Sequence, residues 1–114
     1  MKSSIAIFSM IGMIALISCG SSKHRTTETF TVYGNCGMCE STIENALSSD
    51  DGVVYADWIV DTKLLTVKYD TTLISISQIK QTIADVGYDS DSHRAKTEVY
   101  DKLHGCCQYE RPVE

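Results

Sequence analysis

Two cysteines separated by two residues, Cys36 and Cys39, are the pair in this sequence best placed for chemistry. They stand where a β-like segment runs into a helical pattern, a position from which both sulfurs can point to one site. The amides at a helix N-terminus favour the thiolate form of cysteine, which is the form that binds metal. Thiolates select soft ions such as Cu(I). The spacing therefore predicts a soft-metal site in which Cys36 and Cys39 are the ligands.

The same spacing also occurs in thiol oxidoreductases and zinc sites. Zinc usually takes four ligands, and this pair supplies two unless the C-terminal tail contributes more. A thioredoxin-like protein is expected to have a longer βαβ core and a proline beside the active site, whereas the one proline here is Pro112, near the end. Binding of Zn(II) and thiol-disulfide exchange by Cys36 and Cys39 therefore stand as alternatives to soft-metal binding.

The tail, residues 96–114, carries a second set of potential metal ligands, namely His104, Cys106 and Cys107. Adjacent cysteines form a disulfide with each other only under strain, which disfavours that use of the pair. We expect the tail cysteines, with His104 or His93, either to bind metal in a second site or to cap the ion held by the first pair. The alternative is a surface tail whose cysteines are incidental or disulfide-bonded.

The first 18 residues have the features of an export signal, with a lysine followed by the apolar run Ile5 to Ile17. This run is too short to span a bilayer. The residues at its end resemble the lipobox of bacterial lipoproteins, in which the cysteine is lipidated and becomes the new N-terminus: Leu16-Ile17-Ser18-Cys19-Gly20. Residues 1–18 are thus predicted to be a lipoprotein signal peptide, with an ordinary cleaved signal or an uncleaved anchor as alternatives.

Lipidation of Cys19 would hold the protein on a membrane, because each buried CH₂ of an acyl chain contributes about 0.8 kcal/mol. Residues 19–27 then read as a polar tether between the lipid and the folded domain. We expect the protein to be in a bacterial cell envelope, where it faces the periplasm or the cell exterior. Whether the anchor lies in the inner or the outer membrane is left open.

Length and composition limit the classes of protein to which this chain can belong. The chain has 114 residues and is 43% apolar, which is enough for one domain with a core. Its formal net charge of −5 argues against nucleic-acid binding, since proteins that track phosphates usually have a basic surface. The acidity does not by itself indicate a substrate.

Patterns of apolar residues predict alternating strands and helices in the middle of the chain. Residues 28–33 alternate as a half-buried strand, and apolar residues at helical spacing follow from Cys39 to Leu47. Two further alternating stretches, at residues 53–60 and from Leu65 to Tyr69, are joined by a short polar connection. These two stretches predict a hairpin.

A second amphipathic helix is predicted after the hairpin. Ser75 and Gln78 have the spacing of a capping box, and apolar residues recur at helical spacing up to Val86, where Gly87 ends the pattern. A last strand is expected to begin near Tyr88, although the residues after it are almost wholly polar. The predicted order is strand, helix, strand, strand, helix, strand.

Over residues 28–95, the chain resembles the heavy-metal-associated domain family. The residues that carry the resemblance are Phe30, Val32, Cys36, Cys39, Ile43, Ala46, Leu47, Gly52, Val53, Leu65, Val67, Val86, Gly87 and Tyr88. The resemblance implies an α+β fold, a ferredoxin-like βαββαβ sandwich with an antiparallel sheet and two helices on one face. It also implies that Cys36 and Cys39 are the two metal ligands.

Three positions near the metal take their meaning from the same resemblance. Tyr88 matches the aromatic residue that bacterial members place in the loop beside the metal, where the ring would shield the ion. Family members usually have Met two residues before the first cysteine, whereas Gly34 stands there in this chain and Met38 lies inside the CxxC motif. We expect this departure to change how the metal-binding loop is anchored and to make it more mobile.

The family includes copper chaperones, modules of copper-transporting ATPases and a periplasmic mercury-binding protein, so the resemblance implies a carrier and not an enzyme. Cu(I) accepts two thiolates at a nearly linear angle and leaves one flank open to an incoming cysteine, which allows transfer by ligand exchange. Hg(II) is an alternative cargo because it is equally thiophilic. The implied partner is a metal-transporting ATPase or another thiol-bearing acceptor. The protein is expected to be mostly monomeric, with a metal-bridged dimer as the alternative.

Overall fold

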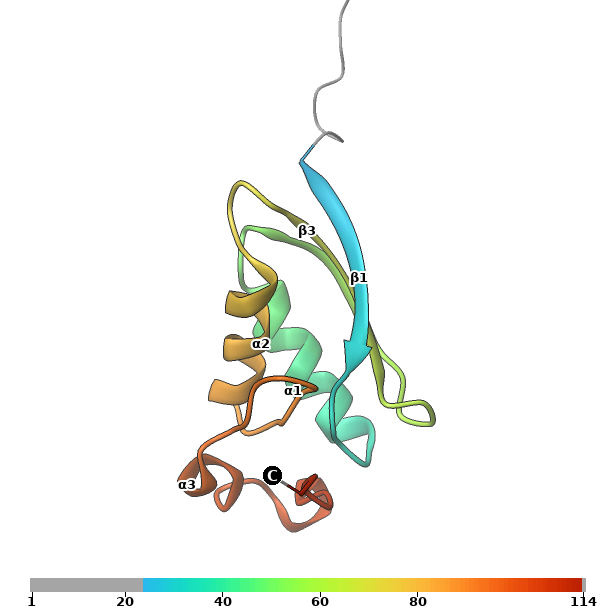
Figure 1. Ribbon diagram of the computed structural model, residues 1–114. Helices are drawn as coiled ribbons and strands as arrows, with labels where there is room; N and C mark the ends of the chain where they lie inside the picture. The colour runs from blue at the N-terminus through green and yellow to red at the C-terminus, as the bar shows by residue number, and fades with distance from the viewer. Residues whose placement is uncertain (1–23, 114) are drawn as a thin grey trace, which may run out of the picture.

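The computed structural model describes residues 24–113. The predicted signal peptide, residues 1–18, and the predicted lipidation site, Cys19, lie outside the described residues. Figure 1 shows a sheet covered on one face by two helices, with the C-terminal segment folded across the lower end of the molecule. Between residues 24 and 113, no helix is both long and apolar enough to cross a membrane.

The sheet consists of three antiparallel strands in the order β1-β3-β2: β1 (Arg25–Thr31), β2 (Val53–Trp58) and β3 (Leu64–Asp70). Alternation along the central strand buries every second side chain on one face, namely Leu65, Val67 and Tyr69. Trp58 at the end of β2 and Phe30 in β1 join the same core. The hairpin predicted from the two alternating stretches is confirmed, because β2 and β3 pair with each other.

Two helices pack on the buried face of the sheet, α1 (Gly37–Ser48) and α2 (Ile76–Asp85). The capping box predicted at the start of α2 is confirmed. The N–H of Gln78 donates to Ser75 Oγ at 3.2 Å, and the N–H of Ser75 donates to Gln78 Oε1 at 2.9 Å. Gly87 follows α2 with a φ of +104°, a left-handed conformation that favours glycine, so the helix ends where the sequence predicts.

Two strand boundaries differ from the sequence-based expectation. β1 begins at Arg25 and not at Glu28, because it pairs with β3 over its whole length, so part of the expected tether lies in the sheet. The strand expected near Tyr88 is reduced to one antiparallel bridge between Val32 and Ser90. The chain turns directly after this bridge, where the N–H of Ser90 donates to the carbonyl of the residue three positions later. Among the described residues, the sheet therefore has three strands.

The tail folds against this domain through a short helix and a 3₁₀ turn, α3 (Thr97–Tyr100) and η2 (Gly105–Cys107). Cys107 and Tyr109 are each only 2% exposed and belong to the same apolar core as the sheet and α1. The Tyr109 ring stacks on Tyr88, with centroids 5.6 Å apart, and meets Tyr100 edge-on at 5.1 Å. The tail is therefore part of the folded unit and not a surface appendage.

Candidate metal centre

Cys36 and Cys39 come together at the N-terminus of α1. Cys36 directly precedes the helix with an extended backbone (φ −155°, ψ 175°), and Cys39 lies in the first turn. Their sulfurs are 3.6 Å apart, far beyond the roughly 2.05 Å of a disulfide bond, so both are free thiols. The two sulfurs thus point to one site, as their spacing predicts.

The two thiols of this pair have different surroundings. The backbone N–H of Cys39 bonds to the Cys36 sulfur and, against the opposing effect of desolvation, lowers the pKa of Cys36 to about 7. Cys39 is fully buried, and its thiol donates to Asn35 Oδ1 at 3.3 Å. Near neutral pH, a large fraction of Cys36 is therefore thiolate, the form that binds metal. The hydrogen bond between Cys39 and Asn35 was not predicted from the sequence. The one signal for it in the sequence is that Asn35 directly precedes Cys36.

Gly34 allows the metal-binding loop to approach Trp58 closely. A Cβ atom on Gly34 would lie 2.9 Å from Trp58 Cη2 and 3.2 Å from Cys39 Cβ, both closer than ordinary van der Waals contact. The indole is fully buried, and its Nε1–H donates to the carbonyl of Val32 at 2.9 Å. Gly34, which stands where family members usually have Met, thus leaves space beside the loop. The Trp58 indole fills this space and packs against the loop.

The turn η2 places the tail cysteines against the first pair. Cys107 Sγ lies 3.9 Å from Cys36 Sγ and 3.8 Å from Cys106 Sγ. The sulfurs of Cys36, Cys106 and Cys107 all lie within 4.8 Å of one another. Of the arrangements considered for the tail, the structure has the one in which its cysteines lie beside the Cys36–Cys39 pair.

The two tail cysteines differ in exposure and protonation. Burial, followed by hydrogen bonding with Cys106 and Cys39, raises the pKa of Cys107 to about 12, so Cys107 is a neutral thiol near pH 7. Cys106 is exposed, and its thiol contacts Met38 Sδ at 3.4 Å. The Met38 thioether, inside the CxxC motif, therefore lies beside the tail.

Tyr88 borders the sulfurs from within the core. Its ring is fully buried, and among residues 24–113 its hydroxyl has no hydrogen-bond partner of ordinary geometry. Burial raises the pKa of Tyr88, and the neighbouring sulfurs of Cys39 and Cys107 raise it further. A hydroxyl in this position can donate to a thiolate when one forms. Tyr88 thus lies beside the candidate site, where the resemblance placed it.

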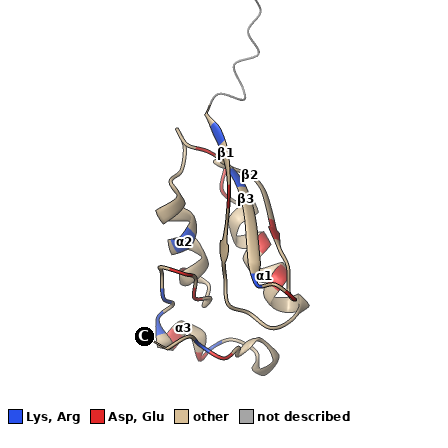
Figure 2. Cartoon of the chain, turned by 45° about the vertical axis from the view of Figure 1, so that its right-hand side comes forward, with Lys and Arg blue, Asp and Glu red and all other residues tan. Residues whose placement is uncertain are grey.

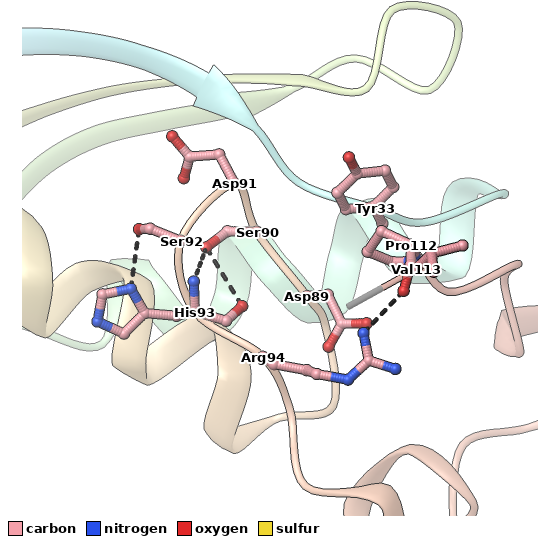
Figure 3. A pocket seen from close by; sticks show the side chains of 9 residues that line it. All are labelled: Tyr33, Asp89, Ser90, Asp91, Ser92, His93, Arg94, Pro112 and Val113. Carbon is pink, nitrogen blue, oxygen red and sulfur yellow. Dashed lines mark hydrogen bonds between the residues drawn. The ribbon is translucent and has the colours of Figure 1, made fainter.

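The two histidines considered as ligands lie elsewhere. His104 is exposed and, within the described part of the chain, does not group with the sulfurs. The ring nitrogens of His93 contact Ser77 Oγ at 3.3 Å and Ser92 Oγ at 3.0 Å. His93 instead lines a cavity of about 300 Å³, whose lining residues include no cysteine (Figure 3). The candidate metal centre therefore consists of sulfur ligands alone.

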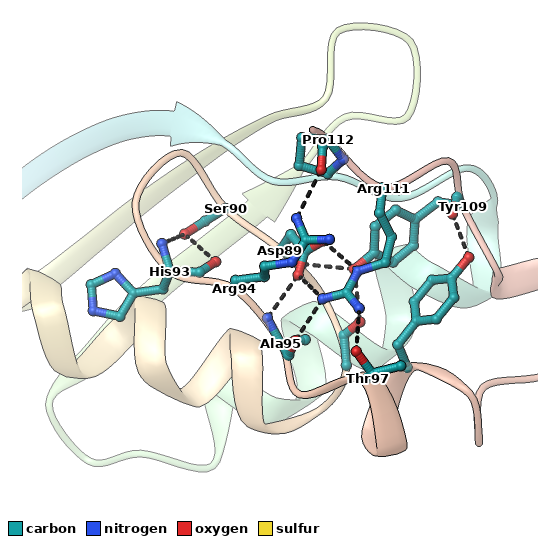
Figure 4. A network of polar contacts seen from close by, with 11 residues as sticks. Asp89, Ser90, His93, Arg94, Ala95, Thr97, Tyr109, Arg111 and Pro112 are labelled. Atoms are coloured by element: carbon teal, nitrogen blue, oxygen red, sulfur yellow. Dashed lines mark hydrogen bonds and ion pairs between the residues drawn. The ribbon is translucent and has the colours of Figure 1, made fainter. Parts of the chain in front are cut away.

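An ion pair fastens the tail beside this centre (Figure 4). Arg111 Nε and Nη2 each donate to a different oxygen of Asp89 at 2.8 Å, and the N–H of Ala95 donates to Asp89 Oδ1 at 2.7 Å. Burial raises the pKa of the Asp89 carboxyl, but the hydrogen bonds from Arg111 and Ala95 outweigh it, so the pKa is lowered overall. The sequence analysis missed this pair, because nothing local links Asp89 to a residue so far along the chain.

A second group of potential ligands is acidic. Oxygen atoms of Glu40, Glu44 and Asp57 lie within 4.8 Å of one another, and Figure 2 shows acidic residues along α1. Burial, and then the charges of Glu40 and Asp57, raise the pKa of Glu44. Carboxylate oxygens suit hard ions, whereas thiolates suit soft ones. The free, converging sulfurs are therefore the stronger candidate for a soft ion.

The chain is similar to copper-handling proteins in sequence and fold. The copper chaperone CopZ of Staphylococcus aureus (strain JH9) is 42% identical over 63 residues, which are 54% of this chain and 93% of the relative. A solved structure of a CopZ metallochaperone is 39% identical with a TM-score of 0.55, and the match covers 57% of this chain and 98% of the other. The soluble region of the P-type ATPase CopA from Bacillus subtilis is 27% identical with a TM-score of 0.56. The match covers 58% of this chain and 44% of the other.

These similarities confirm the expected fold class, an α+β, ferredoxin-like arrangement of an antiparallel sheet with two helices on one face. The heavy-metal-associated domain itself matches residues 29–89, more than half of the chain. That range includes the Cys36–Cys39 pair and ends at Asp89, before the tail. The chain therefore belongs to the heavy-metal-associated domain family.

Proposed function

We propose that this protein binds Cu(I) through Cys36 and Cys39 and passes it on by exchange of thiolate ligands. The observation that carries the proposal is the pair of free sulfurs 3.6 Å apart at the N-terminus of α1, where the pKa of Cys36 is lowered to about 7. A sulfur ligand set suits Cu(I) and disfavours hard ions. The similarity to a copper chaperone supports the same cargo.

Binding needs both sulfurs as thiolates, so uptake of the ion releases protons to solvent. Cys36 loses its proton more readily than an ordinary cysteine, because the amides at the N-terminus of α1 lower its pKa. The hydroxyl of Tyr88 is placed to donate to the Cys39 sulfur when that sulfur is charged. On release, a thiolate of the acceptor forms a Cu–S bond as one Cu–S bond of this protein breaks. No bond of a substrate is cleaved, so the protein acts as a carrier and not as an enzyme.

The acceptor in this proposal is a metal-transporting ATPase or another protein with accessible thiols. The fold similarity to the soluble region of an ATPase supports it, because a second domain of the same fold can present thiols to this one. Hg(II) and Zn(II) are alternative cargoes. Hg(II) is equally thiophilic, and the tail raises the number of nearby sulfurs above the two that would be too few for Zn(II). The carrier is mostly monomeric, and a dimer bridged by metal is the alternative.

The proposal includes attachment to a bacterial membrane through lipid on Cys19. The support is the sequence alone, in which the apolar run of residues 5–17 is followed by a lipobox-like pentapeptide. Replacing Cys19 with Ala in the full chain should abolish incorporation of a labelled fatty acid and move the protein from the membrane to the soluble fraction. Unchanged labelling and fractionation would contradict the anchor and leave the metal site unaffected.

A competitive Cu(I) titration of the reduced chain beginning at Gly20 tests the metal function. The protein should withdraw Cu(I) from a chromophoric chelator, and the double variant Cys36→Ser, Cys39→Ser should lose tight binding. Ser41→Ala, on the exposed side of α1, is the matched control and should bind as the unaltered chain does. Parallel titrations with Hg(II) and Zn(II) rank the alternative cargoes. Tight Cu(I) binding by the double variant would overturn the assignment.

An insulin-reduction assay separates the carrier from a thiol-disulfide protein. The carrier should show no more activity than free dithiols at the same concentration. Strong activity that Cys39→Ser abolishes would instead assign Cys36 and Cys39 to redox exchange.

A further inference from the structure

Cys107 brings a third sulfur to the Cys36–Cys39 pair from a distant part of the chain. Its Sγ lies 3.9 Å from that of Cys36, although 71 positions separate the two residues. Cys36 Sγ also lies 3.6 Å from Cys39 Sγ, so it is the sulfur that links the other two. The three sulfurs form a triad at the N-terminus of α1.

The distances from the Cys36 sulfur to the other two sulfurs match those between ligands of one three-coordinate ion. With a metal–sulfur bond of about 2.3 Å, three sulfurs in a plane around an ion lie about 4.0 Å apart, whereas two sulfurs in line lie about 4.6 Å apart. The distances of 3.6 Å from Cys36 to Cys39 and of 3.9 Å from Cys36 to Cys107 are closer to the first value. Cys36 therefore already lies at the distance from Cys39 and from Cys107 that a shared three-sulfur site requires.

The tail holds Cys107 in this position. Tyr109, two residues later, stacks on Tyr88, and its hydroxyl donates to the carbonyl of Gly87 and accepts the N–H of Asp89, both at 2.8 Å. The ion pair of Arg111 with Asp89 closes the tail beyond it (Figure 4). The Cys107 sulfur is thus fixed relative to α1, as a preorganised ligand must be.

A buried hydroxyl without a partner provides independent support for a charged species at the triad. Tyr88 Oη is enclosed in the core and has no hydrogen bond of ordinary geometry among residues 24–113, and the sulfurs of Cys39 and Cys107 are near enough to raise its pKa. Leaving a buried hydroxyl unpaired is unfavourable. Thiolates bound to a metal would give this hydroxyl a charged acceptor.

We propose that Cys107 is a third ligand, so that Cys36, Cys39 and Cys107 hold Cu(I) in a three-sulfur site that the tail of the protein closes. This inference rests on the proposed function and adds to it. On binding, the Cys107 thiol gives its proton to solvent and its sulfur forms the third Cu–S bond. On transfer, that bond breaks as an acceptor thiolate forms its own, Cys107 regains a proton, and copper stays Cu(I). The tail occupies the coordination position that the acceptor must take.

Cys106 offers a matched control for this role. Its sulfur lies 3.8 Å from Cys107 Sγ and within 4.8 Å of Cys36 Sγ, but Cys106 is exposed and its thiol contacts the Met38 thioether. Replacing either cysteine with serine removes one sulfur at nearly constant side-chain volume. A requirement for Cys107 but not for Cys106 distinguishes the triad from a general need for tail thiols.

X-ray absorption of the reduced chain from Gly20, loaded with one equivalent of Cu(I), tests the ligand number. The unaltered chain and Cys106→Ser should each show three sulfur neighbours, and Cys107→Ser should show two with a shorter mean Cu–S distance. Bathocuproine disulfonate should capture Cu(I) faster from Cys107→Ser than from Cys106→Ser. Two sulfurs in the unaltered chain, or three in Cys107→Ser, would overturn the inference, whereas a chain that binds no Cu(I) would overturn the proposed function itself.

A metal-free measurement keeps Cys107 and so does not depend on how its variant folds. Dibromobimane links two thiols that lie in contact. In the variant Cys39→Ser, Cys106→Ser, the reagent first attaches to Cys36. Above about pH 9, where Cys107 begins to react, it should then link Cys36 to Cys107 in the native protein and not in urea, as read by mass spectrometry of the joined peptides. Failure to form this link in the native protein would overturn the placement of Cys107, even if copper binding by Cys36 and Cys39 were intact.

Discussion

At the residue scale, the pKa values of Cys36 and Cys107 are shifted in opposite directions before any metal arrives. Cys36, at the edge of the site, has its pKa lowered to about 7 by the N–H of Cys39, whereas burial raises that of Cys107 to about 12. An ion that approaches from solvent therefore meets a charged sulfur at Cys36 first. The neutral Cys107 can join afterwards, because a bound ion displaces the proton of a coordinating thiol.

This contrast predicts different pH profiles for alkylation of the metal-free protein. A lowered pKa means that the Cys36 thiolate fraction rises through pH 7, so its reaction with iodoacetamide should reach half its plateau rate near pH 7. Cys107 should stay unreactive to about pH 9, because its pKa is raised to about 12. Peptide mass spectrometry after brief alkylation measures both residues. Equal midpoints for the two cysteines would contradict the assigned environments.

The close approach at Gly34 predicts a loss of stability on Gly34→Ala. The new Cβ would be 2.9 Å from the Trp58 ring, and overpacking of this kind costs about 1–3 kcal/mol. Gly37→Ala is the control, because no atom outside its own surroundings lies within 4 Å of the added Cβ. Its free energy of unfolding should be unchanged or slightly higher. Urea unfolding, followed by the fluorescence of Trp58, measures both, and equal stability of the two variants would contradict the packing.

Sequence reasoning identified residues of the site whose signals are local. Cys36 and Cys39 are separated by two positions at a strand-to-helix junction, and Tyr88 follows the glycine that ends a helix, so pattern and resemblance were sufficient to mark them as candidates. The packing of Trp58 on Gly34 was not predictable, since the two residues lie on different elements. Trp58 lies in the core at the end of β2, and its support of the loop depends on this long-range contact.

At the element scale, periodicity was a good guide where one face of an element is buried. The helix after Ser75 has both a reciprocal cap and an apolar stripe, and it begins at Ile76 as expected. The strand expected at Tyr88 failed because residues 89–94 have no alternating apolar face to bury. Asp89 turns inward and binds Arg111 instead.

The position of the tail depends on the ion pair between Asp89 and Arg111. The substitution Arg111→Met should therefore lower the free energy of unfolding strongly. Asp89 is 1% exposed and Arg111 12%, so removal of the Arg111 guanidinium takes two hydrogen bonds from a buried carboxylate and leaves it with the Ala95 N–H and the charge of Arg94. Loss of one partner of a buried pair costs about 3–5 kcal/mol. Urea unfolding should show this loss. The double variant Arg111→Met, Asp89→Asn should recover part of it, and a single variant as stable as the unaltered chain would show that the pair does not anchor the tail.

At the scale of the whole molecule, the fold brings two distant segments of the chain to one end of the sheet. The loop before α1 supplies Cys36 and Cys39, and the tail returns to the same end with Cys106 and Cys107 (Figure 1). The sequence indicated the chemistry of each segment, and contact between them was one of the arrangements it allowed. Choosing between these required the folded core, because Tyr109 and Cys107 are fixed by long-range packing that no local pattern encodes.

A shared site predicts that Cu(I) stabilises both segments together. If Cys107 is a ligand, opening of either segment in the loaded protein must break a Cu–S bond, so local unfolding of each becomes less favourable. Hydrogen exchange of amides at residues 36–40 and at 104–109 should therefore slow on addition of one equivalent of Cu(I). In Cys107→Ser, slowing should be confined to residues 36–40, whereas Cys106→Ser should behave as the unaltered chain. Slowing at both segments in Cys107→Ser would show that the tail is ordered by contacts other than the metal bond.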